Sequence, residues 1–197
     1  MKQCCFILVL LANVCSSWSQ NDKHQFSIDA GSYRNRYLYP ITNISYQSPT
    51  LFDHFDLSVR LRSYGTFYFY TKDSYDVSPI AYYTVYKNEE HQLIAKAGLG
   101  ADLRLRFVND ERSSATTSCE PIVALNLSKK WSKLKLQITN WNRFYQNGIS
   151  FNLMPEIQYD LGKRFFIYGR YEWTFLQIYQ SSHEWRQDCF IGVGFKI

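Results

Sequence analysis

The sequence predicts an all-β protein: a closed, antiparallel, up-and-down transmembrane β-barrel of ten strands, with eight strands as the alternative. Apolar residues alternate with polar or small ones over long segments, which is strand spacing, and helical periodicity is absent from the sequence. The last segment, "DCFIGVGFKI", keeps this alternation to Ile197. Because a β structure in lipid must close on itself, an ordered terminal strand is what pairing with the first strand requires.

The first residues predict a secretory signal peptide. Lys2 precedes a short apolar run over 4–12, and Ser17 and Ser19 stand three residues and one residue before the expected cleavage. The apolar run is about half of the roughly 20 residues that a spanning helix needs. A lipidated Cys15 is a weaker alternative, because Ala12-Asn13-Val14 matches the usual preceding residues poorly. The predicted division is a signal peptide at 1–19 and a barrel domain at 20–197.

Composition is consistent with a transmembrane barrel. Mean hydropathy is −0.33, which suits strands whose lipid-facing and lumen-facing residues alternate and average out as hydrophilic. Aromatic residues make up 18% of the chain, and the formal net charge of +5 is interleaved rather than gathered in a run. We therefore expect no nucleic-acid partner. With four histidines and no phosphate-binding loop in the sequence, we predict neither a metal site nor a cofactor.

Ten segments carry the strand pattern, although residues 55–71 equally suit one long strand or two strands joined by a turn at Ser63-Tyr64-Gly65. If the two N-terminal segments form a plug or a loop, eight wall strands remain. The predicted strands are 25–33, 36–47, 55–71, 78–87, 93–107, 119–127, 133–141, 149–159, 164–178 and 188–197.

Short and long connections alternate along the chain, so each kind is expected at its own end of the barrel. The short connections are predicted at 88–91, 129–132 and 160–163, and the longer, polar ones at 72–77, 109–118, 143–147 and 179–187.

On these features the chain resembles a small Gram-negative outer-membrane β-barrel of the OmpA/OmpX-like size class. Its ending, "CFIGVGFKI", is similar to the family's C-terminal assembly signal through Ile191, Val193, Phe195 and Ile197, although the family usually closes on an aromatic residue. The resemblance implies an outer-membrane location, with both termini in the periplasm. It also implies contact with outer-membrane lipids, the barrel-assembly machinery as a partner during insertion, and a monomer.

Charged residues lie on the face opposite the apolar one, and we expect them in the lumen. Barrels of this size are filled by side chains, so the favoured interpretation is an ion-paired lumen that is closed. The excess of Arg and Lys leaves a narrow anion-favouring pore as the alternative. The predicted lumen residues are Arg60, Arg62, Lys96, Asp102, Arg104, Arg106, Lys133, Lys135, Glu156, Arg164, Arg170 and Glu172. Aromatic residues predicted for the membrane interface, or else for the core of a soluble barrel, are Trp131, Trp141, Tyr159, Trp173 and Trp185.

The chemistry-bearing residues do not predict an enzyme. His54 stands near Asp53, Asp56 and Ser58, and His183 stands in "SSHE", but neither set marks an activated serine, and the His-x-Ser order of lipid A deacylases is not reproduced. Cys119 and Cys189 are expected as free thiols on the outward face. We predict a non-enzymatic structural or surface-interaction barrel, with no catalytic residue. The alternatives are a lipid-modifying outer-membrane enzyme and a soluble, secreted, lipocalin-like binding barrel.

Overall fold

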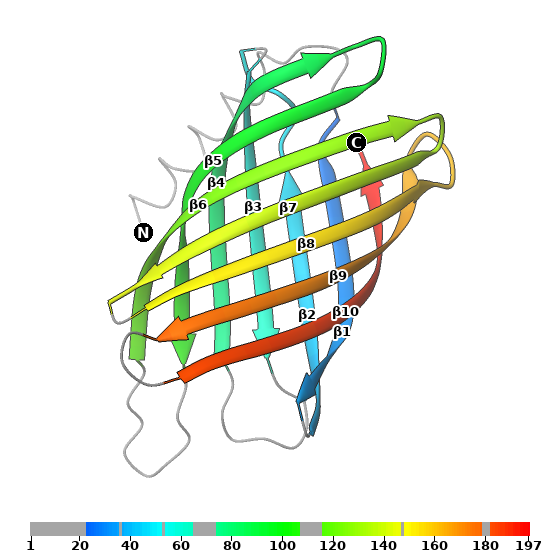
Figure 1. Ribbon diagram of the computed structural model, residues 1–197. Coiled ribbons are helices and arrows are strands. Elements are labelled where there is room, and N and C mark those ends of the chain that lie inside the picture. Colours follow the sequence, from blue (N-terminus) through cyan, green and yellow to red (C-terminus); the bar gives the residue numbers. More distant parts are fainter. Residues whose placement is uncertain are drawn as a thin grey trace, which may run out of the picture.

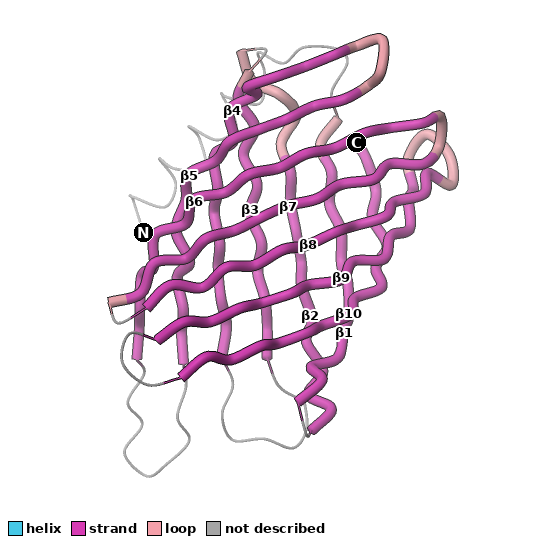
Figure 2. The backbone as a smooth tube through the Cα atoms, in the orientation of Figure 1, coloured by secondary structure: helices cyan, strands magenta, loops and turns pink. Residues whose placement is uncertain are grey.

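The computed structural model describes residues 23–35, 37–52, 54–64, 74–106, 116–146, 148–178 and 182–197. They form one closed, antiparallel barrel, which confirms the predicted fold class (Figure 1). Figure 2 shows the same backbone as strands tilted around the barrel. The strands are β1 (Gln25–Asn35), β2 (Tyr37–Gln47), β3 (Phe55–Tyr64), β4 (Ser74–Asn88), β5 (Leu93–Arg106), β6 (Thr116–Trp131), β7 (Leu134–Tyr145), β8 (Gly148–Asp160), β9 (Phe165–Ile178) and β10 (Ser182–Lys196).

The barrel closes between its first and last strands. β1 pairs with β2 on one side and with β10 on the other, in a register that sets Phe26 opposite Phe195 and Ile28 opposite Val193. The two N-terminal segments are therefore wall strands, and the eight-strand alternative is wrong. The terminal alternation in "DCFIGVGFKI" belongs to the strand that removes the open edge.

Several predicted boundaries are wrong because the strands run further than the apolar alternation does. β7 continues to Tyr145 and β10 begins at Ser182, so most of the loops predicted at 143–147 and 179–187 are strand. Residues 65–70, the second half of the predicted strand 55–71, lie outside the described residues, and so does most of the predicted loop 109–118. The longer connections, 65–73 and 107–115, join strands at the end of the barrel opposite the termini.

The barrel has an apolar exterior and a polar interior. Among the described residues, 19 polar or charged residues are buried against 10 hydrophobic ones. Large apolar side chains point outward instead, with Ile191 80% exposed, Leu99 69% and Phe165 63%. A soluble lipocalin-like barrel requires the reverse distribution, with its apolar face inside. No helix among the described residues has the length and hydrophobicity needed to cross a membrane.

Inward aromatic side chains lie over glycines of the neighbouring strand. A Cβ atom on Gly192 would lie 2.5 Å from Cζ of Tyr168, and one on Gly31 would overlap the ring of Phe190. Phe190 is the only apolar residue larger than glycine on the inward face of "CFIGVGFKI", and it is buried because Gly31 leaves room for its ring. The glycines near the closure of the barrel thus allow rings, rather than water, to fill the lumen there.

Candidate functional site: the barrel lumen

A network of hydrogen-bonded ions spans the lumen, which we call the central ion network. Arg62 on β3 donates two hydrogen bonds to Glu172 on β9, at 3.1 and 2.5 Å, and a third to Asn43 Oδ1 at 2.8 Å. Because β3 and β9 are four strands apart in the barrel, the Arg62–Glu172 pair bridges the lumen rather than neighbouring strands. The members of the central ion network are Asp29, Asn43, Arg62, Tyr168, Arg170 and Glu172.

Asp29 on β1 completes the central ion network. Its carboxylate accepts hydrogen bonds from Asn43 Nδ2 at 2.5 Å, Tyr168 Oη at 2.6 Å and Arg170 at 2.8 Å. The ring of Phe190 lies between the two guanidinium groups, with Arg170 4.8 Å and Arg62 5.5 Å from its centroid. All these charges are buried, and buried charges of this kind are stable only while paired. Each partner therefore depends on the others.

A second set of charges, which we call the distal ion cluster, lies toward the end opposite the termini. Arg104 Nε donates to Asp76 Oδ1 at 2.9 Å, and Arg143 Nε lies 3.0 Å from Asp102 Oδ2 without hydrogen-bond alignment. Ser78 donates to the other oxygen of Asp102 at 2.5 Å. Glu120 completes the distal ion cluster, 3.9 Å from Arg104. The two arginines thus stand among three carboxylates.

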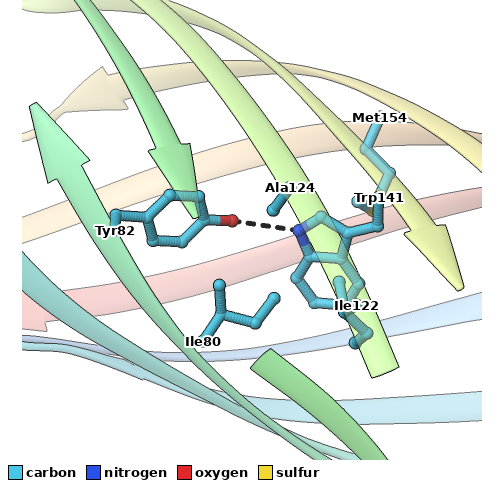
Figure 3. Close-up of a cluster of buried hydrophobic side chains, with 6 residues drawn as sticks. All are labelled: Ile80, Tyr82, Ile122, Ala124, Trp141 and Met154. Atoms are coloured by element: carbon cyan, nitrogen blue, oxygen red, sulfur yellow. Dashed lines mark hydrogen bonds between the residues drawn. The ribbon is translucent and has the colours of Figure 1, made fainter. Parts of the chain in front are cut away.

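Six buried side chains from β4, β6, β7 and β8 form an apolar plug on one side of the lumen (Figure 3). Trp141 fills most of it, and its indole N–H donates to Tyr82 Oη at 3.0 Å, so the one polar atom of the ring is satisfied. Arg60 from β3 lies over the Trp141 ring, 4.2 Å from the centroid. The members of the apolar plug are Ile80, Tyr82, Ile122, Ala124, Trp141 and Met154.

Toward the termini the lumen widens into a polar space that we call the cup. It consists of two adjoining cavities of about 520 and 500 Å³ and a narrower one of about 90 Å³ that reaches Arg60 and Arg170; Gln25 and Lys135 line all three. Lys96 pairs with Asp56 on the wall of the cup. The lumen is therefore open at the termini and filled by side chains further in.

The structure places most of the predicted lumen residues inside the barrel. Arg60, Arg62, Lys96, Asp102, Arg104, Lys135, Glu156, Arg170 and Glu172 point inward. The side chain of Arg106 lies outside the described part of the structure. Lys133 and Arg164 were expected in the lumen, and both are exposed in turns, after β6 and before β9 respectively. Their prediction was wrong because strand alternation gives no direction to a residue within a turn.

Sequence reasoning predicted Asp102, Glu156 and Glu172 in the lumen but missed several other acidic residues there. Asp29, Asp56, Asp76 and Glu120 are buried and each contacts a basic side chain. Arg143 was missed as well. All five stand at inward positions: the alternation within the predicted strands already marks Asp29, Asp56 and Glu120, whereas Asp76 and Arg143 lay in predicted loops that are strand.

The aromatic residues predicted for the membrane interface do not all point the same way. Trp131, Tyr159, Trp173 and Trp185 are exposed on the outer surface, whereas Trp141 is 2% exposed and points into the lumen. It lies at an odd position of β7, the same side as Lys135 and Arg143. Nearness to a strand end had suggested an interface residue, but the alternation decides the direction of the side chain.

The residues of the assembly signal all point outward. Ile191, Val193, Phe195 and Ile197 are exposed, and the Phe195 ring stacks on Phe26 of β1 at 5.2 Å. Cys119 and Cys189 are exposed free thiols, as predicted.

The predicted histidine sets do not form a catalytic cluster within the described residues. His54 is exposed and its ring lies 5.5 Å from that of the outward-facing Tyr83, whereas Ser58 lines the narrow cavity inside the barrel. Asp56 is engaged by Lys96 and Thr50. Asp53, Ser181 and the side chain of His183 lie outside the described residues. No group of three His, Cys, Asp or Glu residues suited to a metal occurs in the described part of the chain.

Comparison with known proteins finds similarity at the level of structure. No model of a known protein family matches the chain, and no curated protein matches its sequence significantly. The N-terminal β-barrel domain of Pseudomonas aeruginosa OprF aligns at 14% identity and a TM-score of 0.45, over 89% of this chain and 98% of that one. Neisserial surface protein A aligns at 12% identity and a TM-score of 0.45, over 89% of this chain and 96% of that one. The KdgM porin aligns at 9% identity and a TM-score of 0.47, over 88% of this chain and 99% of that one.

Proposed function

We propose that this chain is a non-enzymatic outer-membrane β-barrel with a structural or surface-interaction role and a lumen closed by its own side chains. The observation that carries the proposal is the reversed distribution of side chains, polar inside and apolar outside. Residues 1–19 act as the signal peptide in this proposal, and residues 20–197 form the barrel.

The apolar exterior is continuous around the wall. Ile44, Ile28, Val193 and Ile167 are successive neighbours across β2, β1, β10 and β9, and all four are exposed. The largest exposed apolar patch on a typical soluble monomer covers about 300–600 Å². The exposed apolar residues of this chain do not form one such patch but continue from strand to strand around the barrel. Lipid is the solvent that accommodates such a surface without cost to folding. Outer-membrane lipids are therefore the proposed surroundings of a monomeric barrel.

The closed lumen is supported by the layers that fill it. Between the cup and the opposite end lie Arg60, the apolar plug, the central ion network and the distal ion cluster. The Arg62–Glu172 bridge holds β3 to β9 across the lumen, so opening a path needs buried ion pairs to break. This arrangement favours a closed barrel over the anion-favouring pore.

The proposed orientation puts the termini and the cup in the periplasm. The connections at the end with the termini include the two-residue turn after Trp131, while 65–73 and 107–115 join strands at the opposite end. Longer connections on the outside and shorter ones toward the periplasm are the usual arrangement of such barrels. The outward residues of β10 are the surface available to the barrel-assembly machinery during insertion.

Fractionation with heat-modifiable gel mobility tests the proposal. The chain, expressed with its first 19 residues in a Gram-negative host, is expected in the outer-membrane fraction, and its unboiled form is expected to migrate differently from the boiled one. Recovery of folded protein in the soluble periplasmic fraction without detergent would contradict the membrane assignment. Replacing His54 with Ala is expected to leave the composition of host lipid A unchanged by mass spectrometry, since His54 and Ser58 face opposite sides of the wall.

A further inference from the structure

Two basic side chains that line the narrow cavity of the cup are not held in a direct ion pair. Lys135 and Arg60 both line the narrow cavity of about 90 Å³, and neither forms an ion pair within the described residues. From this we infer that the cup binds an oxyanion, the carboxylate or phosphate group of a small polar molecule, and that Lys135 and Arg60 hold it.

Most other basic side chains that line the cup contact a carboxylate, whereas Lys23, which lines the cavity of about 520 Å³, forms no ion pair among the described residues. Lys96 pairs with Asp56. Lys196 and Lys130 both contact Asp160, at 2.6 and 3.2 Å. The remaining pairs around the cup are Lys87 with Glu89 and Arg170 with Asp29. An anion in the narrow cavity therefore meets Lys135 and Arg60, neither of which is held in a direct ion pair, and Glu156 is the one carboxylate that lines the same cavity.

Lys135 is placed to meet such an anion. It stands on the inward face of β7, where the neighbouring strands present Lys130 and Gln158. Gln137, the next inward residue of β7, lines the same cavity. The Gln158 amide is fixed by donating to Asp160 Oδ1 at 2.8 Å. Two glutamines thus line the cavity beside Lys135, together with the carboxylate of Glu156.

Arg60 forms the inner limit of the cup. Its guanidinium lies over the Trp141 ring, 4.2 Å from the centroid, and it donates to the Met154 sulfur at 3.4 Å, which is a weak acceptor. A stacked guanidinium keeps the N–H groups of its edge free, and their planar fork matches the two oxygens of a carboxylate or phosphate. The apolar plug behind Arg60 stops the anion from passing further.

The dimensions of the cup indicate the class of ligand. The narrow cavity has room for about three water molecules, which suits one oxyanion group. The adjoining cavity of about 520 Å³ is lined by neutral polar residues such as Gln47, Thr84 and Asn126, and by charged residues of both signs, most of them in the pairs Lys96–Asp56 and Lys87–Glu89. A molecule with one anionic group and an uncharged, hydrogen-bonding body fits both, and it enters at the termini.

Calorimetric titration of the refolded full chain in detergent micelles tests the inference, with inorganic phosphate and succinate as separate probes. Saturable binding of at least one probe is expected, and the tighter one shows whether phosphate or carboxylate is preferred. Lys135→Gln and Arg60→Gln are each expected to weaken binding about tenfold or more, as for a lost charge-assisted hydrogen bond. Lys133→Gln is the matched control, because it removes the same charge from the same hairpin outside the cup and is expected to change nothing.

Acetylation of lysines followed by mass spectrometry gives a second measurement on the unmutated protein. Phosphate or succinate is expected to slow acetylation of Lys135 and to leave Lys133 unaffected. Absence of saturable binding up to about 10 mM, or equal weakening by the Lys133 and Lys135 variants, would overturn the inference. Neither result would affect the proposed barrel role, since heat-modifiable mobility does not involve the cup.

Discussion

The Arg62–Glu172 bridge is expected to be the most sensitive ion pair of the barrel. Replacing Glu172 with Gln keeps the shape of the side chain but leaves Arg62 without its negative partner. Both side chains are at most 5% exposed, so water cannot replace the lost charge. Removing one partner of a buried pair costs about 3–5 kcal/mol. Because Arg62 retains the Asn43 oxygen at 2.8 Å, we expect a loss near the lower end, about 3 kcal/mol.

The measurement is urea unfolding of the protein in lipid vesicles, followed by tryptophan fluorescence and by loss of the fast-migrating unboiled form. Glu89→Gln is the matched control: its partner Lys87 is 3.1 Å away, but the two side chains are 82% and 56% exposed, and such pairs contribute about 0–1 kcal/mol. A second variant, Arg62→Met with Glu172→Leu, removes both charges together and is expected to recover stability relative to Glu172→Gln. A Glu172→Gln barrel as stable as the Glu89→Gln control would refute the reasoning.

Three further substitutions test the apolar plug, the packing beside β10 and the outward face. Trp141→Ala removes the largest member of the apolar plug, so channel conductance in planar bilayers is expected to rise above that of the unmutated barrel; equal, near-zero conductance would show that the ion pairs alone close the lumen. Gly192→Val places methyl groups against the ring of Tyr168 and the Cβ of Asp29 and is expected to reduce the folded fraction on unboiled gels; an unchanged fraction would contradict this packing. Ile191→Arg on the outward face is expected to lower the free energy of unfolding in vesicles by about 2–4 kcal/mol, as for a cation that faces lipid near the midplane. A change below about 0.5 kcal/mol, which is the range for an ordinary surface position, would argue that this face does not contact lipid.

Sequence alternation predicts direction well because strand geometry alone determines it. It placed Lys135 and Glu172 in the lumen and Ile191 outside, without knowledge of any partner. It failed for Lys133 and Arg164, since a turn has no fixed alternation. Two strands were also predicted too short: β7 ends later and β10 begins earlier than predicted. The alternation in both continues through polar residues, which resemble loops in composition.

The partners across the lumen could not be predicted. Arg62 and Glu172 are 110 residues apart, and their contact depends on the number of strands and on the stagger of the closed sheet. A change from ten strands to eight would bring other side chains opposite each other. Likewise, the burial of Phe190 depends on Gly31 in the strand that pairs with β10, and so on closure itself. Local patterns therefore predict the wall of this barrel, while the contents of its lumen follow from how the wall closes.

β10 shows why closure and lumen packing are linked. Its outward residues continue the apolar exterior from β9 to β1, and three successive inward residues are Phe190, Gly192 and Gly194. If bulky residues replaced those glycines, the rings of Phe166 and Tyr168 would have no space beside the strand, although the outward face would remain unchanged. The pairing of β10 with β1 thus depends on an inward face that is small enough to accept side chains from β9. The outward residues of β10 are free to contact lipid and to take part in assembly, because only the inward face of this strand has to fit the aromatic rings of β9.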